Sequence, residues 1–545
     1  MRRLLAVMLA LVSVISLGAQ DGMPSEADQI REELRKLKAD YEQRLQRLED
    51  RLQQLDSAKR APTTNQATAP PPIPAPAAAQ RQTALTNISV NRQLEGQFLE
   101  NTESRERALL AEPPPWRDRA EQVLEDFMDI HGYFRAGYGR SDEGGPQVGF
   151  QAPGALAKYR LGNEAENYGE LSFGKNFYVP NLFKLDREPR AEGAPTGPIA
   201  RVQATMSIYN PYEDLLSSGS TDFGLPEAWA AIGNVIDAQP DMKFWAGSRF
   251  YRRHDIHISD FFFYNMSGSG AGMEDLQLPF GKLAFAWIGA ASGSGFSDLP
   301  EPDANNKAGF SKANYDLRLY DVPLPFGKGE FGFVYARAGS GKDSNGNSAP
   351  DTDGVAFTFL HTRDKFLSDD GFNKFSLQFG TGAAKTFTSG FETFTTDNGI
   401  FIRPDSRDSW RFRATEHFTA TLGPHFSIGP AFVYQFTDYG DEGGVVQWAS
   451  AGVRPILQFN RFFSLALETG VDWVKNEDEG TSAPLAKVTL APQVSLGGLF
   501  MSRPVLRAFL TYAQWGDEFQ GQVGGNSYSD TSRGLTYGAQ MEAWW

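Results

Sequence analysis

Cysteine is absent from this sequence of 545 residues, and after the first 19 residues so is any long apolar run. Without cysteine the chain forms no disulfide bonds, so its stability must come from a core, a barrel wall or oligomerisation. The lack of a run of about 18 apolar residues excludes a conventional transmembrane helix. Two classes remain open: a soluble protein, and a membrane-spanning barrel whose alternating strands never look hydrophobic in a window.

Basic residues are also fewer than acidic residues. The chain has 52 basic and 67 acidic side chains and a net charge of −15, whereas nucleic-acid binding requires a clustered basic surface. Aromatic residues are abundant instead, with 41 Phe, 18 Tyr and 10 Trp beside 55 Gly. This composition argues against nucleic acid as a partner and favours a barrel with aromatic girdles.

The first 19 residues have the layout of a secretory signal peptide. A basic start at Arg2 and Arg3 precedes an apolar stretch over residues 4–17, and the small residues Gly18 and Ala19 follow. We therefore expect the mature protein to begin near Gln20, outside the cytoplasm. Together with a barrel, this predicts the outer membrane of a Gram-negative bacterium, with the N-terminal extension in the periplasm.

Residues 20–58 predict an α-helical coiled coil, because apolar residues recur at steps of three and four, with one stutter between Tyr41 and Leu45. Parallel self-association fits this pattern, and a single amphipathic helix on a globular surface is the alternative. Residues 59–128 are rich in Pro and Ala at their start and predict an extended linker with short helices. The apolar positions of the coil are Ile30, Leu34, Leu37, Tyr41, Leu45, Leu48, Leu52 and Leu55.

Residues 129–545 consist of short alternating segments separated by Gly, Asn, Asp and Pro, the pattern of many antiparallel strands. Over residues 463–473 one face is apolar and the other polar, and the last segment alternates likewise and ends on Trp545. About 18 strands of roughly 10 residues fit this length. The expected fold class is therefore all-β, a transmembrane antiparallel β-barrel.

The side of each strand that faces the lumen follows from its alternation. Four aromatics fall on that side, Tyr133, Tyr168, Phe372 and Trp544. A sugar presents an apolar ring face and an edge of hydroxyls, so a pore that guides it needs an aromatic strip beside charged donors and acceptors. The alternative is that these rings only fill the barrel and the charges are solvated. The charged candidates are Arg135, Arg160, Glu170, Arg253, Asp255 and Asp260.

Several stretches between residue 129 and the end resemble the maltoporin family of sugar porins. They are residues 131–133, 158–164, 253–257, 268–272, 371–375, 502–504 and 538–545, and include His131-Gly132-Tyr133, Arg253-His254-Asp255-Ile256-His257 and Ser502-Arg503-Pro504. The resemblance implies a homotrimer of 18-stranded barrels, each narrowed by an inward-folded third loop around residues 253–272. It also implies that oligosaccharides pass along an aromatic slide at the four inward rings and a polar track at the six charged residues above.

The chain departs from the family at several of these positions. A slide Trp is replaced by Met501, which follows Phe500, and the aromatic contributed by a neighbouring subunit falls on Tyr212 or Tyr209. A constriction Tyr is replaced by Phe262, and a track Arg by Pro226. The coiled-coil extension resembles that of sucrose porins, so the identity of the sugar stays open between maltodextrin-like and sucrose-like oligosaccharides.

Two functions therefore remain open. One is a channel for passive diffusion of sugars; the other is a general porin or a tether, in which the coiled coil binds a periplasmic partner or peptidoglycan and the barrel anchors it in outer-membrane lipid. His254 and His257 lie three apart but lack a third metal ligand, and no catalytic constellation is evident. We expect neither an enzyme nor a metal or cofactor.

Overall fold

The computed structural model describes residues 128–178, 198–211, 221–291, 311–339, 341–342, 348–349, 351–390, 392–396, 399–402, 407–440, 443–497 and 500–545. The predicted signal peptide, coiled coil and linker lie outside these residues, as does Tyr212. Across the described part no helix is both long and apolar enough to cross a membrane.

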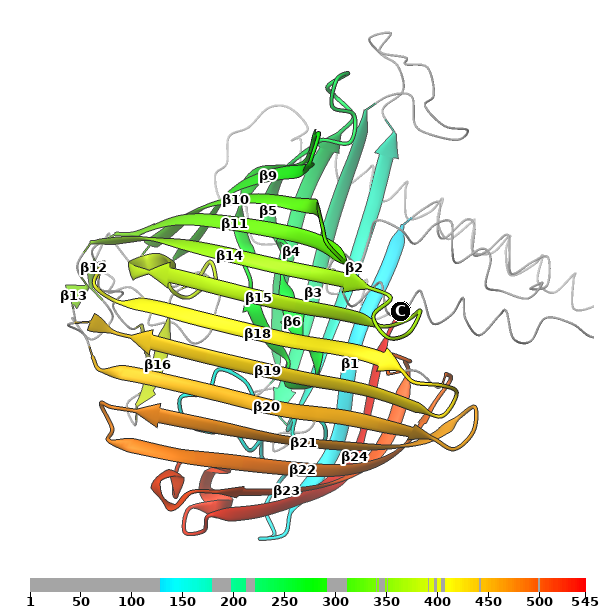
Figure 1. Ribbon diagram of the computed structural model, residues 1–545, viewed down its shortest axis with the longest axis vertical. Helices are drawn as coiled ribbons and strands as arrows, with labels where there is room; N and C mark the ends of the chain where they lie inside the picture. The colour runs from blue at the N-terminus through cyan, green and yellow to red at the C-terminus, as the bar shows by residue number, and fades with distance from the viewer. Residues whose placement is uncertain are drawn as a thin grey trace, which may run out of the picture. The chain divides into compact units, whose positions relative to one another are not determined.

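Eighteen strands form one closed antiparallel barrel (Figure 1), which confirms the predicted fold class and strand number. They are β1 (Asp129–Ser141), β2 (Glu166–Tyr178), β3 (Ile199–Pro211), β4 (Asp222–Gly233), β5 (Lys243–Arg249), β8 (Gly268–Leu278), β9 (Gly281–Ala291), β10 (Ser311–Leu324), β11 (Gly327–Ala338), β14 (Thr352–Asp364), β15 (Phe372–Thr381), β18 (Trp410–Thr421), β19 (Phe426–Asp438), β20 (Val445–Gln458), β21 (Phe463–Asn476), β22 (Thr481–Ser495), β23 (Val505–Trp515) and β24 (Arg533–Trp544).

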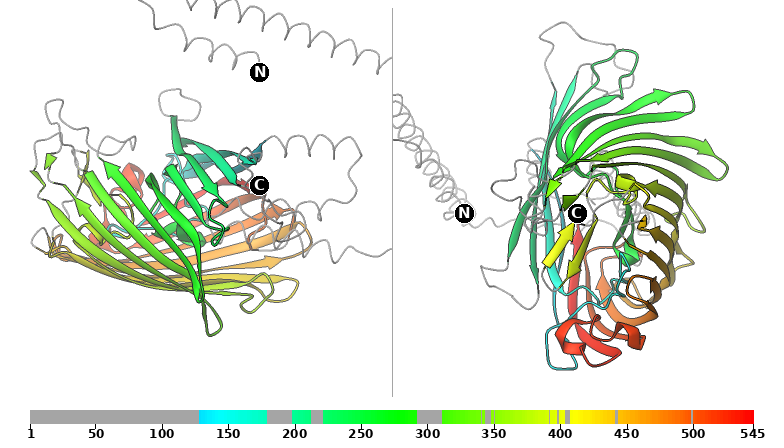
Figure 2. Two further views of the ribbon diagram at one scale, coloured as in Figure 1. Left: turned by 90° about the horizontal axis from the view of Figure 1, so that it is seen from above. Right: turned by 90° about the vertical axis from the view of Figure 1, so that its left-hand side faces the viewer.

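Each barrel strand pairs with the next along the chain, and the last pairs with the first, so that Tyr133 of β1 lies opposite Trp544 of β24. The colours in Figure 2 follow this order round the wall, from the green strands through yellow and orange to red. Closure leaves no unpaired strand edge, which the hydrocarbon phase requires because it offers no water to bond a free N–H or C=O.

The short elements lie in the connections between barrel strands. They are β6 (His254–Ile256), η2 (His257–Ser259), β7 (Phe261–Tyr264), β12 (Gly341–Lys342), β13 (Ser348–Ala349), η3 (Gly382–Ala384), β16 (Thr393–Thr396), β17 (Gly399–Ile402), η5 (Asp517–Phe519) and η6 (Gly525–Tyr528). We call residues 142–165 the first loop, residues 250–267 the third loop and residues 382–409 the sixth loop. The opposite rim of the barrel carries mainly short turns, and β1 begins and β24 ends there.

Apolar side chains cover the outer face of the wall. On β11 and β14, Phe331 packs against Phe359 and Phe333 against Phe357, with ring centroids 5.3 and 5.2 Å apart. The alternate residues of these two strands, such as Val334 and Thr358, face inward and are buried. Exposed large apolar side chains in such number suit lipid rather than water.

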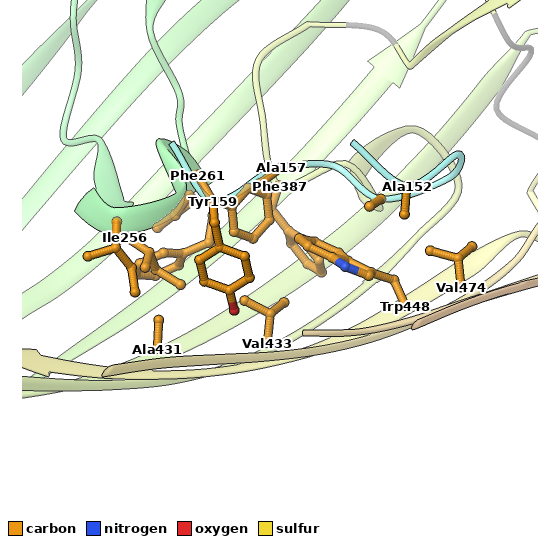
Figure 3. Close-up of a cluster of buried hydrophobic side chains, with 14 of the residues drawn as sticks. Ala152, Ala157, Tyr159, Ile256, Phe261, Phe387, Ala431, Val433, Trp448 and Val474 are labelled. Atoms are coloured by element: carbon orange, nitrogen blue, oxygen red, sulfur yellow. The ribbon is translucent and has the colours of Figure 1, made fainter. Parts of the chain in front are cut away.

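The lumen is partly filled by loops that fold inward. Figure 3 shows Tyr159 of the first loop and Phe261 of the third above the wall residues Val433 and Trp448. The backbone N–H of Arg160 donates to the carbonyl of Ile258 at 3.0 Å, which joins the first loop to the third. Buried apolar contact and direct hydrogen bonds therefore hold both loops inside the barrel.

The glycine-rich residues 268–272 were expected to belong to the third loop, and this expectation is wrong. They form the start of β8, paired with β5 on one side and β9 on the other. A Cβ at Gly270 would lie 2.0 Å from the carbonyl oxygen of Trp287, and one at Gly272 2.5 Å from that of Phe285. Close approach of neighbouring strands, rather than a turn, explains the glycines.

We expect Gly470→Ala to release the first loop. A Cβ at Gly470 would lie 2.1 Å from the ring of Tyr159, whose hydroxyl bonds Ser450 at 2.9 Å. Overpacking of this kind costs about 1–3 kcal/mol, so thermal stability should fall and ion conductance should rise as the loop leaves the lumen. In a Tyr159→Ala background the same substitution should have little further effect, and equal losses in both backgrounds would contradict this account.

Candidate functional site

Three of the predicted slide aromatics form a continuous row on the lumen wall. Tyr133 of β1 has its ring centroid 6.1 Å from that of Tyr168 on β2 and 6.4 Å from that of Trp544 on β24. The planes of Tyr133 and Trp544 differ by only 15°. Barrel closure brings β24 beside β1, and the register places Trp544 opposite Tyr133. On the other side of β1, Glu170 of β2 lies opposite Tyr133, which puts Tyr168, two residues earlier on β2, beside the same ring.

Polar partners fix the orientation of the rings in the row. The Tyr133 hydroxyl accepts a hydrogen bond from Arg160 Nη2 at 2.7 Å and donates to Glu542 at 3.3 Å. The Tyr168 hydroxyl donates to Glu170. The Arg503 guanidinium lies 4.1 Å from the ring centroid of Trp544 and covers one of its faces. The row is therefore held in place before any ligand arrives.

Phe372 stands apart from this row. It begins β15, is buried, and packs edge-on against His417 with centroids 5.5 Å apart. His417 in turn lies 6.1 Å from Phe263 of the third loop. Among the described residues no ring contact joins Phe372 to Tyr133, so the predicted slide is divided into a row of three and a separate ring.

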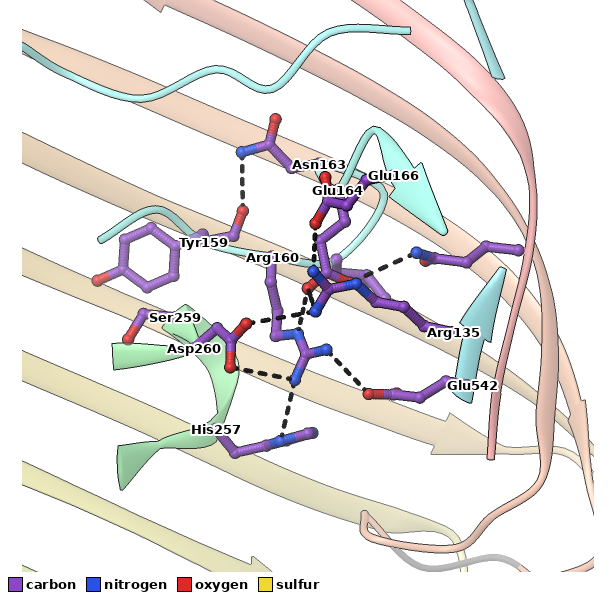
Figure 4. A network of polar contacts seen from close by, with 12 residues as sticks. Arg135, Tyr159, Arg160, Asn163, Glu164, Glu166, His257, Ser259, Asp260 and Glu542 are labelled. Atoms are coloured by element: carbon purple, nitrogen blue, oxygen red, sulfur yellow. Dashed lines mark hydrogen bonds and ion pairs between the residues drawn. The ribbon is translucent and has the colours of Figure 1, made fainter. Parts of the chain in front are cut away.

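Three charged residues of the predicted track, Arg135, Arg160 and Asp260, form a network with neighbouring carboxylates (Figure 4). Arg135 makes ion pairs with Glu164 at 2.7 Å, with Asp260 at 3.3 Å and with Glu166. Arg160 pairs with Glu164 at 2.9 Å and with Glu542 at 3.1 Å. These residues come from β1, β2, the first loop, the third loop and β24, so the network ties both inward loops to the wall.

Asp260 is the exposed end of this network, with 41% of its side chain accessible. Burial favours the neutral form of the carboxyl, but the guanidiniums of Arg160 and Arg135 outweigh burial and hold the pKa of Asp260 below its usual range. A charged acceptor beside two fixed guanidiniums matches the hydroxyl edge of a sugar, because it accepts hydrogen bonds while the arginines donate them.

Of the remaining track residues, Glu170 lies on β2, and Arg253 and Asp255 lie at the start of the third loop. The Arg253 guanidinium lies 3.7 Å from the ring centroid of Phe250 and 4.9 Å from that of Phe262. Asp255 is paired with Phe262 through the backbone of β6 and β7. The ring of Phe262 therefore stacks with an arginine, at the position for which the sequence resemblance implies a tyrosine.

We expect the ion selectivity of the pore to change near pH 6. Burial raises the pKa of Asp255 to about 6, although Lys374, Arg253 and Arg160 oppose the shift and Asp260 adds to it. As the pH falls from about 7.5 to about 5, Asp255 loses its negative charge and the cation-to-anion permeability ratio should decrease. Reversal potentials in a salt gradient measure this ratio, and Asp255→Asn should remove most of its pH dependence; an unchanged dependence would refute the assignment.

Five partners of the network were not among the predicted site residues: Glu164, Glu166, His257, Arg503 and Glu542. Burial, together with the Arg160 guanidinium, lowers the pKa of His257 well below its usual value, so the ring stays neutral between Arg160 and Arg503. Strand alternation places Glu166 and Glu542 on the lumen side and could have identified both. The other three lie in loops or a turn, where no periodicity reports which way a side chain points.

Phe500 and the two third-loop histidines complete the surroundings. Phe500 is buried, and its ring lies 6.4 Å from His257 and against Gly429 of the wall, so an aromatic is present one residue before Met501. His254 lies 3.2 Å from Glu330. No group of three or more possible metal ligands occurs in the described part of the chain.

Comparison with known proteins gives the family of the barrel. Residues 128–545 match the family model described as LamB porin. Solved structures similar to the chain include OccAB1 of Acinetobacter baumannii (11% identity, 77% of this chain and 97% of that chain, TM-score 0.40), OpdK of Pseudomonas aeruginosa (12%, 77% and 99%, 0.38) and Wzi of Escherichia coli (12%, 85% and 97%, 0.36). The family match spans most of the sequence, and the chain therefore belongs to the LamB porin family of outer-membrane β-barrel channels.

Proposed function

We propose that the channel carries sugars, namely maltodextrin- or sucrose-like oligosaccharides, by passive diffusion along the row Tyr168–Tyr133–Trp544. The observation that carries the proposal is the position of this row directly beside the Arg135, Arg160 and Asp260 network. Pyranose rings stack on the aromatic faces while their hydroxyls exchange hydrogen bonds with the charged groups. Each contact is weak enough to release, as a transporting site requires.

Liposome swelling tests the proposal. Vesicles that contain the purified protein should swell faster in maltodextrins or sucrose than in a polyol of equal size, because the sugar is bound along the wall and the polyol is not. Equal rates at equal size would favour the general porin instead. Empty vesicles measure leakage, and a porin without a sugar site gives the size-only reference.

The assembly is proposed to be a homotrimer that does not depend on the N-terminal extension. We expect a chain lacking residues 20–128 to remain trimeric on native gels, because in the family the barrel walls themselves associate. A monomer would mean that the predicted coiled coil holds the trimer together. It would also strengthen the tether alternative, in which the extension binds peptidoglycan or a periplasmic partner.

A further inference from the structure

A second lumen feature lies next to the aromatic row, at the short-turn rim where β20 and β22 end and β21 and β23 begin. It is a pocket lined by three arginines, Arg454, Arg503 and Arg507, together with amide and hydroxyl side chains that include Gln493 and Ser495. None of the described residues that line it is acidic. Its apolar lining includes Leu161 of the first loop and Phe500.

The carboxylates that neutralise these arginines are shared with other cations. Glu542 lies 2.7 Å from Arg503 and 2.9 Å from Arg507, and it also pairs with Arg160. Glu468 pairs with Arg454 and, at 2.7 Å, with Lys487. Five cations therefore share these two carboxylates, and Arg160 also pairs with Glu164 and Asp260. Positive charge remains in excess at the pocket.

The arginines are also deeply buried, since their side chains are only 3–5% accessible. Buried Arg507 Nε has no hydrogen-bond partner among the described residues, although an unpaired buried donor is costly. Burial lowers the pKa of Arg503 to about 10, with Glu542 opposing the shift and Arg507 and Arg454 adding to it. Like charges that crowd together out of water are stabilised by an anion placed between them.

We infer that this pocket binds a compact oxyanion, the sulfate, phosphate or carboxylate substituent of an anionic sugar. Arg503 connects the pocket to the row, because the same guanidinium lines the pocket and covers Trp544. A sugar stacked at the end of the row would then present a charged substituent to Arg507 and Arg454. The sugar part of this inference rests on the proposed function, whereas binding of the oxyanion does not. Guanidinium forks suit oxyanions because two N–H groups can bond two oxygens at once.

The test compares glucose 6-phosphate, glucose and inorganic phosphate as blockers of the ion current through the full-length protein, at equal ionic strength. Glucose 6-phosphate should block at about tenfold lower concentration than glucose, since its phosphate adds charge-assisted hydrogen bonds to the arginines. Arg507→Gln should remove most of this advantage. Arg461→Gln is the matched control, because it removes the same charge from an exposed residue of the turn between β20 and β21 and should leave the advantage unchanged.

The outcomes separate the two proposals. If glucose and maltodextrins block the ion current but glucose 6-phosphate blocks no better than glucose, the oxyanion pocket is wrong and the sugar channel stands. If inorganic phosphate blocks saturably while no neutral sugar does, the pocket stands and the sugar channel is wrong. If Arg507→Gln and Arg461→Gln lose the advantage of glucose 6-phosphate equally, that advantage comes from net charge, and the proposed oxyanion site is wrong. Should Arg507→Gln not fold, thermal stabilisation of the unaltered protein by phosphate over chloride decides, and its absence overturns the inference.

Discussion

Trp544→Ala should weaken sugar block of the ion current about 10- to 100-fold while ion conductance stays equal or rises. Trp544 ends the aromatic row, and a well-packed aromatic in a binding site contributes roughly 2 kcal/mol or more. Its removal also frees Arg503 from the ring, so the pore should not become narrower. Block titrations in a planar bilayer give the affinity and the conductance in one experiment.

The matched control is Trp287→Ala, which removes a tryptophan from the outer face of β9 and should leave sugar block unchanged. Tyr133→Ala should act like Trp544→Ala, whereas Tyr133→Phe keeps the ring and should retain most of the affinity. If sugar block is unchanged in both Trp544→Ala and Tyr133→Ala, the aromatic row only fills space in the barrel and does not bind sugar.

Arg160→Met should both destabilise the barrel and enlarge its conductance. The guanidinium pairs with Glu164 and Glu542, whose side chains are 4% and 3% accessible, so its loss removes one partner from each of two buried carboxylates. Arg135 still pairs with Glu164, and Arg503 and Arg507 still pair with Glu542. The cost should therefore lie below the roughly 3–5 kcal/mol of leaving a buried charge unpaired. The first and third loops would also lose their shared anchor, which should widen the pore and increase current noise.

Thermal unfolding of the folded barrel and single-channel recordings measure the two effects. Arg201→Met is a suitable comparison, because Arg201 forms a less buried pair with Asp129 at 3.0 Å away from the inward loops and should cost much less. Arg160→Lys keeps the charge but not the planar fork and should recover part of the loss. Equal effects of Arg160→Met and Arg201→Met would mean that the network does not hold the loops.

The barrel could be predicted from the sequence because the two faces of a strand meet different solvents. The alternation over residues 463–473 predicts that Ser464, Glu468 and Asp472 face the inside of the barrel, and all three side chains are buried in the structure. The same alternation identified Tyr133, Tyr168 and Trp544 as inward. Strand register then brings Tyr133 beside Trp544, a contact between residues 411 positions apart that no local pattern reports.

Alternation places Arg135 and Glu542 of the network inward, but the members in loops could not be derived from it. Glu164 and His257 lie in loops, where no period fixes the direction of a side chain, and their contacts depend on both loops folding into the lumen. The third loop was expected to extend to residue 272, but the glycines from residue 268 are strand residues of β8. Phe372 faces inward as expected, yet its ring packs against His417 rather than joining the row.

Ion current through the purified protein in a planar bilayer, during titration with maltodextrins, sucrose and a polyol of equal size, tests the central claim most directly. Saturable block by at least one sugar at concentrations where the polyol has no effect is the result expected for a pore with a binding row. A reduction of current that is linear in concentration and depends only on solute size would contradict the sugar channel and leave a general porin.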